Sequence, residues 1–226
     1  MIKKLVKRAF SAIGYDIRRN EQAGFNARYL ASICSPKTVF DVGVGRGTPE
    51  LYKAFPHARF FLIEPLEEFG GTLETLSSAL DCKIYRKALG AVPGEAEISV
   101  EKDPQLSSLQ NRASSSGTAV KRKVEISTLD AILAENPGLS GPVLLKIDTE
   151  GFELEVLKGG VELLKISDYV IAEVSISGRF KGGYDFADII AFMRERGFSV
   201  FDFLSICRGP DGPGANLTDI MFKKNS

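Results

Sequence analysis

The sequence predicts an α/β fold with one mostly parallel β-sheet, and three observations support this prediction. Apolar runs that suit buried strands alternate with helical patterns, so that residues 39–88 read strand, helix, strand, helix, strand. The first strand leads into a glycine-rich turn and then directly into a helix, which is how nucleotide-binding α/β units begin. Two strands joined by a glycine- and proline-rich turn end the chain, so we expect a seven-stranded sheet whose last strand runs antiparallel.

The N-terminal part is expected to be a helical extension, residues 1–36, ahead of a single domain at residues 37–226. Apolar residues recur at helical spacing along residues 2–13, with lysine and arginine on the other face. A basic amphipathic helix of this kind packs on its own domain, the interpretation we favour, or lies on an anionic membrane surface through residues 1–19. A second short helix is expected at residues 25–33.

The glycine turn after the first strand is the pattern around which the chain is organised. Glycines let the backbone turn tightly and approach a ligand closely, and the helix that follows offers free N–H donors. A dinucleotide fingerprint would have its third glycine at position 48, where this chain has Thr48. The turn therefore predicts a nucleoside cofactor, although an ordinary tight loop uses the same residue types. Its acid and glycines are Asp41, Gly43, Gly45 and Gly47.

An acid ends the second expected strand, which covers residues 59–64. Glu64 stands 21 positions after Gly43, where an acid can accept hydrogen bonds from ribose hydroxyls. Both NAD and S-adenosylmethionine carry such a ribose, so Glu64 supports an adenosine site without choosing between them. A helix at residues 66–80 and a third strand at residues 83–88 are expected next.

The segment at residues 94–126 interrupts the alternation of strands and helices. Short strands are expected at residues 97–101 and 122–126, and the serine-rich residues 103–118 between them show no periodicity. These residues form either a solvated loop or a mobile flap over the cofactor. Asp130 then indicates the start of the next helix, as a capping acid.

The fourth sheet strand, residues 142–148, carries the main candidates for catalysis. Lys146 and Asp148 share one side of this strand, with Glu150 just beyond, at the carboxyl end where α/β sheets bind ligands. A lysine amid apolar residues is costly to bury unless it is paired, so we expect it to contact Asp148 or an acid on the next strand. The arrangement is either functional or a purely structural ion pair.

The remaining elements complete the sheet. The loop before Tyr184 carries Arg179 and should emerge on the same rim as Asp148. The expected elements are a helix at 152–164, a fifth strand at 168–174 with Glu173 near its end, a helix at 184–196, and hairpin strands at 198–204 and 217–222.

Composition narrows the function. The chain has 29 Lys and Arg and 29 Asp and Glu residues, so its net charge gives no indication of nucleic acid as a partner. The one histidine, His57, excludes most histidine-based triads and zinc sites. Three scattered cysteines indicate a reducing compartment, and we find no secretion signal. We therefore expect a cytoplasmic protein, at the inner face of the membrane if residues 1–19 bind lipid.

From about Val39 to Phe222 the chain resembles the FkbM family of methyltransferases. The most specific stretch is K-I-D-T-E-G-F-E-L-E-V-L-K-G at residues 146–159. At positions 44 and 45 this chain has Val-Gly where the family usually has Ala-Asn, which brings the turn closer to the general methyltransferase pattern. The other matching motifs are F-D-V-G-V-G-R-G (40–47), I-E-P (63–65), K-A-L-G (87–90), S-S-L (107–109) and T-L-D (128–130).

The resemblance implies a Rossmann-like class I methyltransferase fold and S-adenosylmethionine as cofactor. It also implies O-methylation of a hydroxyl in a small molecule, and we favour a sugar, glycan or glycolipid, or a related secondary metabolite, as the acceptor. The sequence makes no prediction of the oligomeric state. The residues that the resemblance assigns to the cofactor are Asp41, Gly43, Gly45, Gly47, Glu64, Pro65, Ala88, Leu89 and Ser108.

A hydroxyl is a poor nucleophile, so a positioned base should assist its attack. We expect Asp148 to be that base, with Glu150 and Glu173 behind it and Lys146 orienting the carboxylate. The same acids could bind Mg²⁺, a use that we do not favour. Two other functions stay open: a nicotinamide-dependent oxidoreductase, which should have Gly or Ala at position 48, and a catalytically silent nucleoside-binding module, which needs no acid at position 148.

Overall fold

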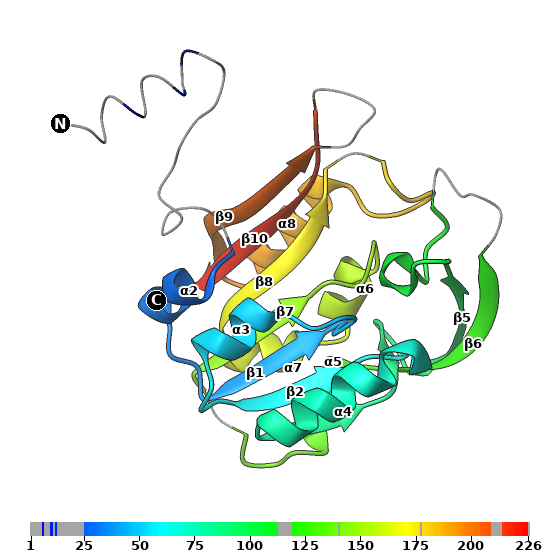
Figure 1. Ribbon diagram of the computed structural model, residues 1–226, viewed down its shortest axis with the longest axis horizontal. Helices are drawn as coiled ribbons and strands as arrows, with labels where there is room; N and C mark the ends of the chain where they lie inside the picture. Colours follow the sequence, from blue (N-terminus) through cyan, green and yellow to red (C-terminus); the bar gives the residue numbers. More distant parts are fainter. Residues whose placement is uncertain are drawn as a thin grey trace.

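A computed structural model describes residues 6, 10, 12, 25–112, 119–139, 141–176, 178–208 and 214–225. Within these residues, seven strands form one twisted sheet in the order β3-β2-β1-β7-β8-β10-β9 (Figure 1). The first five of these run parallel, and β10 runs antiparallel to both of its neighbours. Their bounds, in the same order, are Cys82–Tyr85, Arg59–Ile63, Thr38–Val42, Val143–Ile147, Ser167–Ser175, Ala215–Lys224 and Phe198–Arg208. The α/β prediction with an antiparallel last strand is confirmed.

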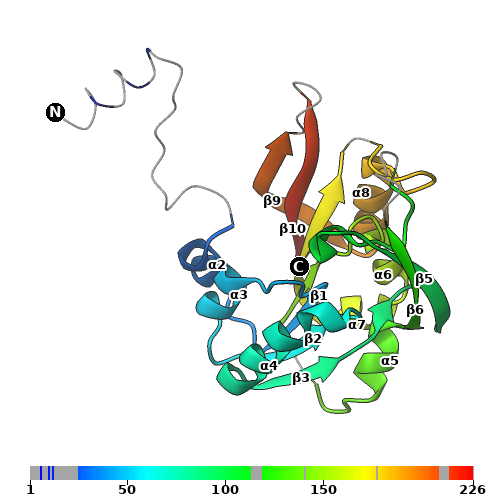
Figure 2. The same ribbon diagram turned by 45° about the vertical axis from the view of Figure 1, so that its right-hand side comes forward.

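Helices cover both faces of the sheet, as Figures 1 and 2 show. One face packs against α2 (Ala27–Ile33), α3 (Pro49–Ala54) and α4 (Gly70–Ala79). The other packs against α5 (Leu129–Ala134), α6 (Glu153–Lys158), α7 (Val161–Ile166) and α8 (Phe186–Glu195). Every residue of the central strands β1 and β7 is buried, because both of their faces are covered. This is why these strands read as nearly continuous apolar runs.

A second, smaller sheet lies beside the carboxyl edge of the first. It contains β4 (Ala88–Leu89), β6 (Val120–Ser127) and β5 (Gly94–Val100), in that order. The expected third strand at residues 83–88 is therefore wrong at its end: the chain leaves the main sheet after Tyr85, and Ala88 pairs with Ile126 of β6 instead. Lys87, at the bend, forms an ion pair of 2.7 Å with Glu125.

The expected helix at residues 152–164 is two helices, α6 and α7, divided at Gly159 and Gly160. A Cβ atom on Gly159 would lie 2.0 Å from the carbonyl oxygen of Gly90, so only glycine fits there. Asp130 accepts hydrogen bonds from the backbone N–H groups at the start of α7, whereas the hydroxyl of Thr128 caps α5. The capping role predicted for Asp130 thus belongs to a different helix.

The predicted basic helix of residues 2–13, like the whole segment 1–19, lies outside the described residues, apart from Val6, Phe10 and Ala12. The second predicted helix is present as α2. No helix within the described part of the chain is long and apolar enough to cross a membrane.

Candidate active site

The glycine turn meets the end of β7 at the carboxyl edge of the sheet. Gly43 has a φ of +76°, and a Cβ atom there would lie 1.8 Å from the carbonyl oxygen of Asp148. The N–H of Asp148 donates to the carbonyl of Val42 at 3.0 Å, so the two strand ends are held together. Glycine is required at position 43 because the backbone of the neighbouring strand occupies the space of a side chain.

Glu64 joins the glycine turn to the end of β2. Its carboxylate accepts hydrogen bonds from the backbone N–H groups of Gly45 and Leu66, each at 2.9 Å. The side chain is buried, and burial raises the pKa of Glu64 to about 7, although both backbone donors act to lower it. A carboxylate oxygen can accept more than one hydrogen bond, so Glu64 still has acceptor capacity for a ligand.

A pocket opens beside Glu64, between the glycine turn, β4 and the short helix η3 (Pro104–Leu106). Its walls include the apolar side chains of Ile63, Leu89 and Leu109, and its polar groups include Glu64 and Asp148. An apolar slot with a few convergent polar groups is the usual form of a small-molecule site. The predicted cofactor residues that line it are Gly43, Gly45, Glu64, Pro65, Ala88 and Leu89.

Three predicted cofactor residues lie behind the pocket lining. Asp41 is fully buried, where it accepts a hydrogen bond of 2.6 Å from the hydroxyl of Tyr52 in α3. Gly47 has a φ of +94° and faces the ring of the same tyrosine. Ser108 donates its hydroxyl to the carbonyl of Glu150 at 2.5 Å, and it is the preceding residue, Ser107, that lines the pocket. These residues shape the turns that surround the pocket.

Lys146 connects the glycine turn to the acids of β7. Its ammonium group lies 3.1 Å from a carboxylate oxygen of Asp41, 3.4 Å from one of Asp148 and 3.1 Å from the carbonyl oxygen of Gly43. Burial acts to lower the pKa of Lys146, but the two carboxylates outweigh it and the pKa is raised. The lysine therefore stays charged. Of its two carboxylate partners, Asp148 is the one that the sequence predicted, whereas Asp41 lies on β1, an earlier strand, and not on the next strand of the chain.

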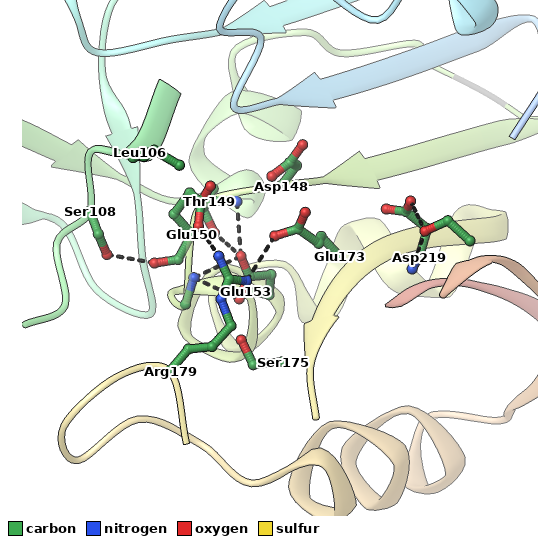
Figure 3. A network of polar contacts seen from close by, with 12 residues as sticks. Leu106, Ser108, Asp148, Thr149, Glu150, Glu153, Glu173, Ser175, Arg179 and Asp219 are labelled. Atoms are coloured by element: carbon green, nitrogen blue, oxygen red, sulfur yellow. Dashed lines mark hydrogen bonds and ion pairs between the residues drawn. The ribbon is translucent and has the colours of Figure 1, made fainter. Parts of the chain in front are cut away.

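The turn after β7 places Glu150 between two arginines, of which Figure 3 shows Arg179. One oxygen of Glu150 accepts hydrogen bonds from Arg112 at 2.9 Å and from Arg179 at 2.7 Å. Burial nevertheless raises the pKa of Glu150 above its ordinary value. The side chain of Asp148 is 30% exposed, compared with 13% for Glu150 and 18% for Glu173. Asp148 is thus the most accessible of the three predicted acids.

Glu173 comes from the end of β8 and shares Arg179 with Glu150, at 3.2 Å. Burial and the nearby Asp148 and Glu150 raise the pKa of Glu173 to about 8. Asp219 stands directly opposite Glu173 on β10 and accepts a hydrogen bond of 2.5 Å from the hydroxyl of Ser205 (Figure 3). The sequence interpretation missed Asp219, although alternation along the last strand could have placed it on this face.

Phe180 packs against the turn that follows β7. Its ring fills the space beside Gly151, where a Cβ atom would lie 2.5 Å from the ring. The guanidinium groups of Arg112 and Arg179 each lie 5.2 Å from the ring centroid. Residues 106–112 and 178–183 therefore meet over the turn after β7. Neither Arg112 nor Phe180 stands in a local pattern that indicates this contact.

The start of the predicted flap lies against the glycine turn. The N–H of Arg46 donates to the side chain of Gln105 at 3.2 Å, and the Arg46 guanidinium pairs with Asp103 at 2.8 Å. This position agrees with the flap interpretation, while its motion stays a prediction. The rest of the flap includes residues 113–118, which lie outside the described part of the chain.

The site also offers carboxylates that magnesium could use. In the described residues, no group of three or more His, Cys, Asp or Glu side chains is arranged to hold a metal ion. Asp148, Glu150 and Glu173 instead contact Lys146 and Arg179. Magnesium stays the alternative that we do not favour.

The chain is similar to known proteins in sequence and in fold. A family model described as "Methyltransferase FkbM domain" matches residues 41–200. The chain is similar to a methyltransferase FkbM from Methylobacillus flagellatus KT, with 18% identity, a TM-score of 0.50, and coverage of 90% of this chain and 46% of that one. It is also similar to the magnesium protoporphyrin IX methyltransferase ChlM from Synechocystis PCC 6803 with bound SAM, at 11% identity and a TM-score of 0.48, covering 99% and 97% of the two chains. None of the curated proteins matches the sequence.

The first of these likenesses bears on the fold, which is that of the Rossmann-like methyltransferases. The chain spans about half the length of the Methylobacillus flagellatus protein.

Proposed function

The chain belongs to the FkbM methyltransferase family, and from this premise we propose that it transfers a methyl group from S-adenosylmethionine to a hydroxyl of a sugar, glycan or glycolipid. The observation that carries the proposal is a single pocket that contains both a buried carboxylate suited to a ribose, Glu64, and a partly exposed carboxylate suited to a hydroxyl, Asp148. A methyltransferase of this type needs both functions side by side.

The residues of the pocket fit an adenosine. Apolar side chains from β2, β4 and the segment after η3 would enclose the base, and Glu64 would accept hydrogen bonds from the ribose hydroxyls. Gly43 and Gly45 line the pocket and carry no side chain, so they present backbone to a ligand there. When bound, S-adenosylmethionine supplies an electrophilic methyl group on a positively charged sulfur.

We assign the base to Asp148. It lies at the carboxyl end of a central strand, lines the pocket, and is more exposed than the other two candidate acids. It would accept the proton of the acceptor hydroxyl, a role that contributes about 10²–10⁴-fold to such reactions. Lys146, held by Asp41, would orient the carboxylate. Glu150 and Glu173, both paired with Arg179, would form the wall on the acceptor side.

Several features support a hydroxyl-rich acceptor. Carboxylates are strong hydrogen-bond acceptors for hydroxyl groups, and Asp148, Glu173 and Asp219 are near neighbours on adjacent strands. A glycolipid acceptor would also give the basic residues 1–19 a membrane surface to contact. The nicotinamide alternative has no comparable support, because the matched family is one of methyltransferases.

Calorimetric titration with S-adenosylhomocysteine, beside NAD, tests the cofactor assignment. We expect the wild-type protein to bind S-adenosylhomocysteine and not NAD. Mass spectrometry of reactions with S-adenosylmethionine and a panel of neutral sugars, glycans and glycolipids then tests the transfer, with Asp148→Asn as the inactive control. Binding of NAD alone, or binding of neither nucleoside, would contradict the proposal.

A further inference from the structure

A buried carboxylate holds the turn that presents the proposed base. Glu153, the first residue of α6, is 1% exposed. One of its oxygens accepts hydrogen bonds from the N–H of Thr149 at 2.9 Å and from the N–H of Gly151 at 3.0 Å. The hydroxyl of Thr149 also donates to it, at 3.2 Å. Glu153 thus binds both sides of the turn that contains Glu150 and follows Asp148 (Figure 3).

This turn has an unfavourable backbone conformation. Glu150 has a φ of +53° and is the one non-glycine residue with a positive φ in the described chain, and Gly151 follows with a φ of +96°. Side chains other than glycine rarely adopt this region, so neighbouring contacts must hold the turn in place. The hydrogen bonds from the N–H groups of Thr149 and Gly151 to Glu153 hold the turn, together with the one from Ser108 to the carbonyl of Glu150.

Tyr184 anchors Glu153 from a different element. Its hydroxyl donates to the second carboxylate oxygen of Glu153 at 2.7 Å. The same hydroxyl lies 3.5 Å from the N–H of Ser175, at the end of β8. Among the described residues, no lysine or arginine pairs with Glu153, so a neutral tyrosine is its only side-chain partner from outside the turn.

These contacts connect the two strand ends that carry the acids of the site. β7 ends at Ile147 and leads directly into Asp148 and the Glu150 turn, and β8 carries Glu173 two residues before Ser175. Tyr184 stands between them, because its hydroxyl contacts Glu153 on one side and Ser175 on the other. We propose that Tyr184, acting through Glu153, is a positioning residue that holds Asp148 and Glu150 in place for methyl transfer. This inference rests on the function proposed above.

The variant Tyr184→Phe tests the inference, because it removes one oxygen atom and keeps the ring that packs on the core. Tyr29→Phe is the matched control: it removes a hydroxyl that bonds Asp202 on β9, on another part of the sheet. We expect kcat to fall about tenfold or more in Tyr184→Phe, while the KM for the acceptor and the Kd for S-adenosylhomocysteine change by less than about threefold. The control should keep all three values.

Glu153→Gln and the double variant sharpen the test. If the hydroxyl acts through the carboxylate, the double variant Tyr184→Phe/Glu153→Gln should lose no more kcat than Glu153→Gln alone. Independent losses that multiply would overturn the inference. So would a kcat within about twofold of wild type in Tyr184→Phe, or an equal loss in the Tyr29→Phe control.

Amide hydrogen exchange separates this inference from the proposed function. Loss of the Tyr184 hydroxyl should make the amides of Thr149 and Gly151 exchange about tenfold faster, and the control should not. If wild-type protein methylates no acceptor in the panel, the proposed function fails, and the exchange measurement still decides whether Tyr184 holds the turn. Unchanged protection of both amides in Tyr184→Phe would overturn the inference.

Discussion

Glu64→Gln is the substitution that most directly tests the cofactor site. Glutamine keeps the size of the side chain and one acceptor oxygen, but it replaces the other oxygen with a donor. In the structure, both oxygens already accept backbone hydrogen bonds at 2.9 Å, from Gly45 and from Leu66. One of those N–H groups would then face the new NH₂ group, and one acceptor for the ribose hydroxyls would be lost.

The expected loss of affinity follows from these contacts. A hydrogen bond to a charged group contributes about 1.5–3 kcal/mol, so the loss of one ribose contact of about 2 kcal/mol should weaken S-adenosylhomocysteine binding about 30-fold. The pKa of about 7 for Glu64 adds a pH dependence. If the ligand binds the carboxylate form, wild-type affinity should fall about tenfold between pH 8 and pH 6, because about nine tenths of the molecules carry a proton there at pH 6.

Calorimetric titration at several pH values measures both effects. We expect Glu64→Gln to bind weakly and with no change of affinity between pH 6 and pH 8. Glu67→Gln is the matched control, since Glu67 is an exposed acid in η2 (Glu67–Phe69), outside the pocket lining. Wild-type affinity in Glu64→Gln, or the same pH dependence in Glu64→Gln as in wild type, would contradict the assignment of Glu64 to the ribose.

Three further predictions concern the carboxyl edge of the sheet. Asp148→Asn should lower kcat by about 10²-fold or more, and the Kd for S-adenosylhomocysteine should stay within about threefold of wild type. Steady-state kinetics would measure the first effect and calorimetric titration the second. Gly43→Ala should lower the midpoint of thermal unfolding and abolish nucleoside binding, since its Cβ atom would lie 1.8 Å from a backbone oxygen; a wild-type melting curve would contradict this. The raised pKa of Glu173, about 8, means that the folded protein binds a proton that the unfolded chain releases near its ordinary pKa of 4.5. Its contribution to stability is therefore present at low pH and lost as pH rises through about 8, and urea unfolding at pH 6 and pH 9 should show this loss in wild type and less of it in Glu173→Gln.

Most of the sheet could be predicted because its strands are short, buried and bounded by clear turn residues. Strand β7 and the glycine turn are examples, since both faces of the sheet are covered and the apolar runs are nearly unbroken. The error at residues 83–88 arose because the run continues across a change of sheet, which depends on the pairing of Ala88 with a distant strand. The division of the helix at Gly159 likewise depends on the approach of Gly90, which no local pattern indicates.

The candidate site could be predicted where it follows from strand ends. Glu64, Lys146 and Asp148 were accessible to this reasoning because parallel strands bring their carboxyl ends to one edge. Arg112 and Phe180 were not, because they reach the site from segments whose partners lie far away in the sequence. Contacts between loops are set by tertiary packing, and the sequence periodicity that identifies strands carries no information about them.

The close contacts at two glycines of the site separate positions of this chain that cannot be exchanged from segments that can. Gly43 and Gly151 admit no side chain, because a carbonyl oxygen and an aromatic ring occupy the space. Residues 106–112 and 178–183, in contrast, reach Glu150, on the side that we propose for the acceptor, through the long side chains of Arg112 and Arg179. A chimaera that receives both segments together from a relative should therefore acquire that relative's acceptor preference, and it should retain its affinity for the methyl donor where the relative also has Ser and Leu at positions 107 and 109, which line the proposed cofactor pocket. Exchange of either segment alone would separate the two arginines that share Glu150, and such a chimaera should be less stable than either parent.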